Sequence, residues 1–133
     1  QKKMKLENIH FVGHVKHQMI PYYLFSADIL LALWSKKVPT INFCSPLKIF
    51  EYMASGNTII THDFPPIREI LEDNYDCLFL NPDKNDDIVL KIKSVLNNSA
   101  SEKFGSNARK KAFKHYSWDV RAKIIHERLE LRT

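Results

Sequence analysis

The residues best suited to chemistry in this sequence lie close together after Cys44. Ser45 is a good helix N-cap, and Pro46 after it suits the first helical position, where its fixed φ matches the helix. The backbone amides of Leu47 and Lys48 then have no partner inside the helix, and together with the helix dipole they form a pocket for an anion. Lys48 adds a positive charge in the same turn.

Glu51 extends this pattern from a phosphate to a nucleotide. It follows Lys48 by three residues and Leu47 by four, so the three share one helix face. Helical side chains lean towards the N-terminus, and a carboxylate can accept hydrogen bonds from the two neighbouring hydroxyls of a ribose. A phosphate at the helix tip and a diol one turn along describe a nucleoside diphosphate. The alternative is a plain surface Lys–Glu pair on a helix that binds nothing.

The elements that position these residues follow from the hydrophobic pattern. Apolar runs predict strands at residues 8–12, 28–33, 58–61 and 77–80. Helical spacing predicts helices at residues 19–27, 46–55 and 65–71, with others that start near Asp86 or Asp87, near Ser99 and at Ser117. This alternation predicts an α/β fold, a Rossmann-like parallel sheet with helices on both faces. Ligands of such sheets bind beyond the carboxyl ends of the strands, which directs attention to residues 42–51.

Two of the predicted helices carry clear apolar stripes. Residues of the helix after Asp87 share one face, namely Ile88, Ile92, Val95 and Leu96. The last helix is expected to bury a stripe formed by Trp118, Ala122, Ile125 and Leu129. Ser99 and Glu102 have the spacing of a capping box.

Composition sets broad limits. The chain has 133 residues and a formal net charge of +5, which suits one soluble domain. The basic residues are spread out, so a solvated helix face is favoured over nucleic-acid binding.

Cys44 and Cys77 lie in apolar stretches and are interpreted as buried hydrophobes in a reducing compartment. His10, His14 and His17 do not have a common zinc spacing, and no metal site is expected.

One longer run narrows the function. The segment Ser45-Pro-Leu-Lys-Ile-Phe-Glu-Tyr-Met-Ala-Ser-Gly56, followed by Asn-Thr-Ile-Ile-Thr61, resembles the signature of retaining GT-B glycosyltransferases of family four. Weaker matches, in the same order as in the family, are Phe11-Val-Gly-His-Val15, Tyr22-Tyr23 with Ala27-Asp28, Pro66 to Leu71 with Glu69, and Tyr116-Ser-Trp118.

The resemblance implies roles for individual residues. Glu51 stands where the family's second E-x7-E glutamate binds the ribose diol, and Leu47 and Lys48 stand where backbone amides bind the diphosphate. Val15 stands where main-chain groups contact the nucleobase. The first glutamate of E-x7-E is replaced by Phe43, so no contact to the donor sugar is transferred, and no catalytic residue is assigned. The glycine usual before the last strand is also missing, since residues 74–77 read Asn-Tyr-Asp-Cys.

The resemblance also implies an incomplete domain. Residues 1–133 correspond to part of a donor-binding domain, the C-terminal half of a GT-B fold, with residues 117–133 as its closing helix. The first two strands of the family's domain have no counterpart here, which leaves the strand at residues 8–12 without its usual neighbour in a sheet of order 3-2-1-4-5-6. The acceptor domain is absent as well, so this part alone is expected to be inactive.

The expected function is therefore that of a glycosyltransferase domain that binds a UDP- or GDP-sugar for transfer with retention. The resemblance implies cytoplasmic synthesis of cell-surface polysaccharide or glycolipid at the inner face of the membrane, with peripheral membrane contact through the whole enzyme. Neither a cofactor nor a metal is expected, and the partners are the nucleotide sugar and the acceptor domain. The alternatives are a nucleotide-sugar 2-epimerase of GT-B fold and a non-catalytic domain that binds a nucleotide or a partner.

Overall fold

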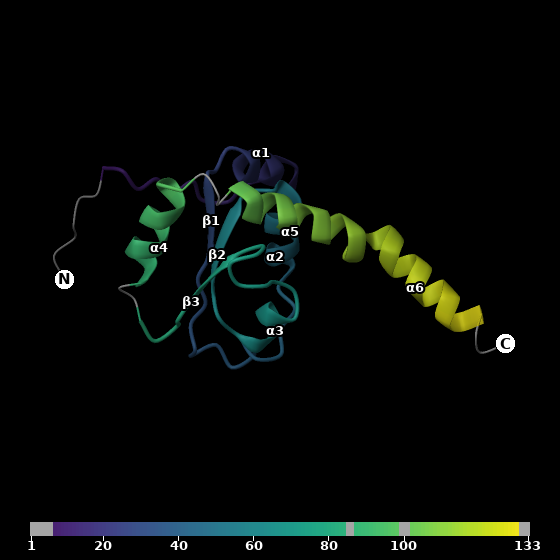
Figure 1. The fold of residues 1–133 in the computed structure, drawn as a ribbon. Coiled ribbons are helices and arrows are strands. Elements are labelled where there is room, and N and C mark those ends of the chain that lie inside the picture. The colour runs from purple at the N-terminus through teal and green to yellow at the C-terminus, as the bar shows by residue number, and fades with distance from the viewer. Residues whose placement is uncertain (1–6, 85–86, 99–101, 131–133) are drawn as a thin grey trace.

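The computed structural model describes residues 7–84, 87–98 and 102–130. Its centre is a parallel sheet of three strands in the order β1-β2-β3 (Figure 1). The strands are β1 (Ile29–Ala32), β2 (Thr58–His62) and β3 (Leu78–Leu80). All five residues of β2 are buried, as expected for the central strand of a sheet covered on both faces. Three of the four predicted strands and the α/β class are thus confirmed.

The predicted strand at residues 8–12 is wrong. Residues 7–8 form a turn, and residues 9–16 run without regular structure up to His17. Phe11 is 95% exposed and Val12 57% exposed. A strand is stabilised by a ladder of hydrogen bonds to a neighbour, and no described strand lies beside this segment. The apolar pattern alone therefore does not produce a strand here.

The predicted helices are all present among the described residues, with adjusted ends. They are η1 (His17–Met19), α1 (Ile20–Phe25), α2 (Leu47–Ser55), α3 (Pro65–Arg68), α4 (Asp87–Leu96), α5 (Glu102–His115) and α6 (Trp118–Glu130). The proposed cap at Ser99 and the alternative start at Asp86 lie outside the described residues.

The start of α2 differs from the prediction by one residue. Pro46 is the N-cap, with an extended ψ of 109°, and Leu47 is the first helical residue. Ser45 therefore lies one position outside the helix and makes no cap. Proline tolerates the N-cap because its carbonyl still accepts the amide of Ile49 at 3.0 Å.

Helices cover both faces of the sheet (Figure 1). On one face, residues of α2 and α5 pack with the sheet, including Ile49, Met53 and Ala108 around Ile59. On the other face, α4 contributes Val95 to a smaller cluster with residues of β2 and β3. Of the predicted stripe on α4, Ile88 and Ile92 also pack here, but Leu96 is 64% exposed.

Helix α5 approaches the C-terminal end of α2 very closely. Gly56 ends α2 with a φ of 81°, in the left-handed region that favours glycine. A Cβ atom added to Gly105 would lie only 2.0 Å from the carbonyl oxygen of Gly56. Arg109 completes the contact, since its Nη1 donates to the carbonyls of Ala54 at 3.0 Å and Ser55 at 3.3 Å. These are carbonyls that the helix leaves without internal partners.

A polar turn connects α3 to β3 in place of the missing glycine. Asn74 takes a φ of 59°, which asparagine tolerates better than most residues. Asp76 is fully buried, where it accepts the amide of Glu72 at 2.6 Å and pairs with Lys111 of α5 at 2.8 Å. Asp73 accepts the amide of Phe79 at 2.8 Å. Side-chain carboxylates thus satisfy the backbone of this turn and tie it to α5.

The prediction that α6 buries its stripe is wrong for this structure. Trp118 is 85% exposed, Ile125 50% and Leu129 59%, and Ala122 is exposed as well. In Figure 1, α6 extends away from the sheet beyond the end of α5. The helical period correctly indicates an amphipathic helix, but no described element lies against its apolar side.

Candidate functional site

The tip of α2 has the free amides that the sequence predicts. The hydrogen bond from Ile49 to Pro46 is the first one at this end, so the amides of Leu47 and Lys48 point beyond the helix. The side chain of Leu47 is 73% exposed. The tip opens on a hollow of about 320 Å³. The residues around this hollow are Ser45, Leu47, Phe50, His115, Tyr116, Ser117, Trp118 and Arg121.

Glu51 lines a second cavity, of about 360 Å³, between α1, α2 and α5. The walls are mostly apolar and include Leu24 and Phe113. Its charged or titratable members are Glu51, Arg109 and His17. A largely apolar cavity with a few polar groups is the usual form of a small-molecule site.

The proposed site residues are therefore neighbours on one helix that face different spaces. The hollow at the tip contains Leu47 but not Glu51, and the cavity of Glu51 does not include Leu47. Lys48 points to a third position, where its ammonium group lies 5.4 Å from the centre of the Trp34 ring. Val15 is half-buried and lines neither space, although His17 two residues later lines the cavity of Glu51.

Phe43 stands in the loop that precedes α2, and its side chain is 86% exposed. Its amide donates to the carbonyl of Thr40 at 2.9 Å, which shapes the loop through the backbone. A phenyl ring cannot accept the hydroxyl hydrogen bonds that a carboxylate accepts. Any sugar recognition at this position would have to use apolar contact.

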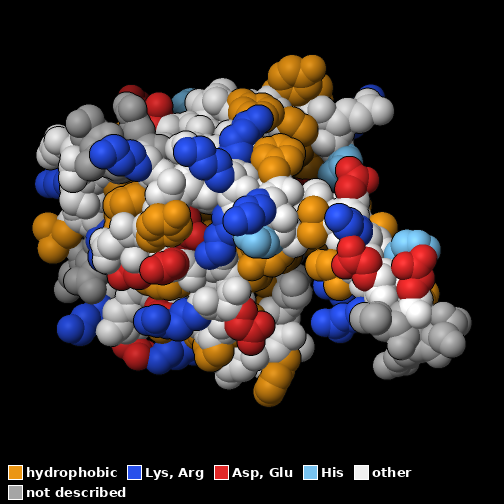
Figure 2. All heavy atoms as spheres, turned by 45° about the vertical axis from the view of Figure 1, so that its right-hand side comes forward, with side chains coloured by type: hydrophobic (Ala, Val, Ile, Leu, Met, Phe, Trp, Pro, Cys, Tyr) orange, Lys and Arg blue, Asp and Glu red, His pale blue; other side chains and the backbone are white. Residues whose placement is uncertain are grey.

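Several residues around these spaces have no signal in the sequence. Arg109 and Phe113 on α5, and His115 and Arg121 at the α5–α6 junction, look like part of an ordinary basic helix surface. Figure 2 shows basic, acidic and apolar side chains interspersed on the face it presents. The four residues reach α2 only because α5 packs along it, which no local pattern reveals.

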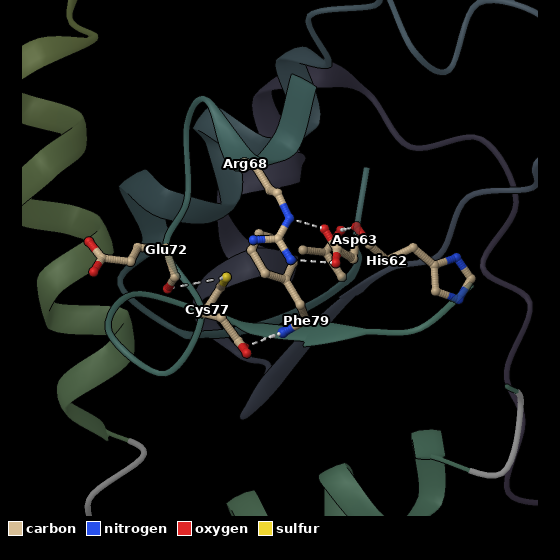
Figure 3. Close-up of polar contacts among 8 residues, drawn as sticks. His62, Asp63, Arg68, Glu72, Cys77 and Phe79 are labelled. Carbon is tan, nitrogen blue, oxygen red and sulfur yellow. Dashed lines mark hydrogen bonds and ion pairs between the residues drawn. The ribbon is translucent and has the colours of Figure 1, made fainter. Parts of the chain in front are cut away.

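A polar cluster lies where β1 and β2 end, at the carboxyl edge of the sheet. His62 places its Nδ1 3.0 Å from the amide nitrogen and 2.7 Å from the carbonyl oxygen of Trp34. Next to it, Asp63 pairs with Arg68 through two contacts of 2.5 and 2.6 Å (Figure 3). The hydrogen bond to Asp63 and its charge raise the pKa of the Arg68 guanidinium. The pair fixes the turn into α3.

Both cysteines are free thiols, but the predicted burial holds only for Cys77, because Cys44 lies in the loop before α2 and is half-buried. Cys77 is fully buried, and its Sγ donates to the carbonyl of Glu72 at 3.6 Å (Figure 3). Burial, with a smaller contribution from the nearby charge of Asp76, raises the pKa of this thiol far above its usual value. Cys44 is half-buried, with its Sγ 3.8 Å from the carbonyl of Ile41.

Two further features concern the described residues as a whole. Within them, no three His, Cys, Asp or Glu side chains gather in an arrangement that could hold a metal ion. None of the helices in the described ranges combines the length and the apolar character needed to cross a bilayer.

Comparison with known proteins identifies the family to which this chain belongs and a solved structure with a similar fold. The glycosyl transferase-like family matches residues 1–127, and the chain therefore belongs to that family. The fold resembles the crystal structure of Anabaena HepE in complex with UDP-glucose, with a TM-score of 0.69 and 18% sequence identity. That match covers 84% of this chain but only 29% of the HepE chain. No curated protein sequence matches significantly. The predicted membership of a glycosyltransferase family is confirmed by the family match, and the predicted fold is confirmed by the structural match.

Proposed function

We propose that this domain binds a nucleoside-diphosphate sugar, with UDP as the first candidate, for retaining glycosyl transfer by a larger enzyme. The observation that carries the proposal is the position of Glu51. Its carboxylate lines a largely apolar cavity of about 360 Å³, one helical turn from the exposed amides of Leu47 and Lys48. HepE, which shares the fold, was crystallised with UDP-glucose, and this supports UDP over GDP.

In this proposal the nucleoside occupies the cavity between α1, α2 and α5. Glu51 accepts hydrogen bonds from the ribose hydroxyls, and main-chain groups near Val15 contact the base. Phe113 and Leu24 offer apolar surface to the nucleoside. The diphosphate extends to the helix tip, where amides and the helix dipole stabilise its charge.

The same arrangement would assist the reaction. Transfer of the sugar leaves a nucleoside diphosphate with increased negative charge, and preorganised donors aimed at that charge lower the barrier. Lys48 adds a cation in the first turn, and Arg121 adds another beside the hollow at the tip. Because Phe43 replaces the glutamate that would face the sugar, we place the sugar contacts outside this position. We also propose a role at the cytoplasmic face of a membrane, in polysaccharide or glycolipid synthesis, which the family likeness supports.

Calorimetry with UDP, GDP and UDP-glucose tests the proposal. Glu51→Ala should weaken UDP binding by roughly 10-fold to 100-fold, because it removes charge-assisted hydrogen bonds to the ribose. The matched control is Glu127→Ala on the exposed face of α6, which should bind as the wild type does. Equal UDP affinity in Glu51→Ala and wild type would refute the site. Product analysis with UDP-glucose separates transfer from epimerisation and from binding without turnover.

A further inference from the structure

We infer that His62 is a positioning residue of the proposed diphosphate site. Its ring holds the backbone of Trp34 in either protonation state, and its protonation adds a positive charge at the backbone of the residue whose ring lies under Lys48. The inference rests on the proposed function, because it assumes that the diphosphate binds at the start of α2, where Lys48 belongs to the first turn. It concerns a residue outside the motif that carries the family resemblance.

The clamp replaces strand pairing at the end of β1. The last paired residues of the two strands are Ala32 and Thr61. Beyond them, the amide and the carbonyl of Trp34 both approach His62, at 3.0 and 2.7 Å from Nδ1. The side chain of His62 thus contacts the backbone two residues after β1 ends and holds the chain where it leaves the sheet.

One ring nitrogen cannot serve both partners at once. Without a proton, Nδ1 of His62 accepts the amide of Trp34, whereas with a proton it donates to the carbonyl of Trp34. The second bond is charge-assisted when the whole ring is protonated. Both partners lie within hydrogen-bonding distance, so His62 can gain a proton without releasing Trp34. The charge then changes while the geometry is kept.

Trp34 transmits this geometry to α2. Its ring is partly buried against the main core, and the ammonium group of Lys48 lies 5.4 Å from the ring centre. A cation over an aromatic face is attracted to it. Trp34 Nε1 is buried and has no hydrogen-bond partner within the described part of the chain. The backbone clamp by His62 is therefore a main polar restraint on the residue under Lys48.

The surrounding charges leave the effect of His62 uncompensated. From α2 comes Lys48, and from the loop after β1 comes Lys36, which pairs with Asp83 after β3 at 2.5 Å. Asp63 at the end of β2 pairs with Arg68 of α3, and in Figure 3 the His62 ring points away from that pair. Both carboxylates thus have their own cations. A protonated His62 therefore places its charge next to the backbone of Trp34, the residue whose ring contacts Lys48.

The experiment measures UDP-glucose affinity of the purified protein by calorimetry at pH 5.5 and pH 8. Histidine changes charge in this interval, while UDP-glucose keeps its charge because each of its phosphates is esterified. His62→Asn places a neutral amide at the position of Nδ1, which still accepts the amide of Trp34. His17 and His115 line the two spaces, so the measured quantity is the difference between wild type and variant, which cancels their contribution.

We expect wild-type affinity to rise as the pH falls. The ratio of affinities at pH 5.5 and pH 8 should be roughly fivefold larger in wild type than in His62→Asn, as expected for a unit charge near a partly buried anion. At pH 8 the two should bind alike. His126→Asn, a control on the exposed helix α6, should keep the wild-type ratio. An equal ratio in wild type and His62→Asn overturns the inference.

Nuclear magnetic resonance gives a second readout that needs no ligand. The amide signal of Trp34 should shift with the same midpoint as the ring of His62, while the other signals of β1 and β2 stay in place. If the chemical shift of the Trp34 amide does not change when His62 is protonated, the proposed contact between the two residues is contradicted. Absence of UDP-glucose binding at every pH contradicts the proposed function, whereas binding with an unchanged pH ratio contradicts only the role of His62. His62→Gln repeats the comparison if His62→Asn does not fold.

Discussion

Helices α2 and α6 both carry apolar residues at helical spacing, yet their burial is opposite. Ile49 and Met53 of α2 are fully buried, while Trp118 and Leu129 of α6 are 85% and 59% exposed. The difference does not come from the helices themselves, since each has an apolar side. It comes from the element that lies opposite each helix. Helix α2 packs against the sheet and α5, whereas no described element lies against the apolar side of α6. An apolar stripe indicates which side of a helix can be buried, but it does not show whether another element covers that side.

The packed region also depends on contacts that periodicity does not encode. Gly105 lets α5 approach the end of α2, Arg109 caps the carbonyls there, and Lys111 pairs with a fully buried carboxylate. These contacts should make the α2–α5 region sensitive to single substitutions, whereas α6 should tolerate them.

Gly105→Ala should have the largest effect. The new methyl group would lie 2.0 Å from the carbonyl oxygen of Gly56, so α5 would have to move away from α2. We expect the free energy of unfolding to fall by roughly 3 kcal/mol. Ser106→Ala, the next residue and exposed, is the control and should change stability by less than about 0.5 kcal/mol. Denaturant unfolding followed by circular dichroism measures both, and equal stabilities would mean that α5 is not packed this closely.

Lys111→Met should cost about 2 kcal/mol of unfolding free energy. It leaves the buried carboxylate of Asp76 without its cation, and loss of one partner of a buried pair is strongly destabilising, here reduced because the Lys111 side chain is 27% exposed. Lys110→Met removes the same charge from an exposed neighbour and should be nearly neutral. The prediction fails if the two variants unfold at the same denaturant concentration.

Alkaline pH should weaken the packed region through Cys77. Burial raises the pKa of this thiol, so the unfolded chain ionises above its ordinary pKa of about 8.5 while the folded chain stays protonated. The contribution of this thiol to the free energy of unfolding is therefore fully present below that pH. Above it, the free energy of unfolding falls by about 1 kcal/mol per pH unit. Thermal or denaturant unfolding between pH 8 and 10 should show a shallower loss in Cys77→Ala than in wild type.

Leu129→Ala on α6 should have the smallest effect, with a change in unfolding free energy below about 0.5 kcal/mol, because the side chain is already 59% exposed. Met53→Ala in α2 is the matched buried comparison and should cost roughly 3 kcal/mol. A loss of similar size in both variants would show that the stripe on α6 is covered in solution, and the contrast between the two helices would then disappear.

The candidate site was predicted only in part for the same reason. Local rules place Leu47, Lys48 and Glu51 in the first turns of a helix, and the structure agrees to within one residue. The spaces that Leu47 and Glu51 face are completed by Arg121 and Arg109, which lie more than fifty residues later in the chain. Nothing in the neighbourhood of Arg109 indicates that it reaches the end of α2, since a basic residue on a helix is usually solvated.

Local signals in the amino-acid sequence are enough to predict the three strands, the series of helices and the family signature around Ser45. These depend on features of residues close in the chain, namely apolar periodicity, proline and glycine at helix ends, and a contiguous motif. Three other features required the folded structure: residues 9–16 form no strand, α6 exposes its stripe, and His62 holds Trp34. Each of these depends on a partner group far away in the chain, because a hydrogen bond or a buried surface forms only between two groups that meet.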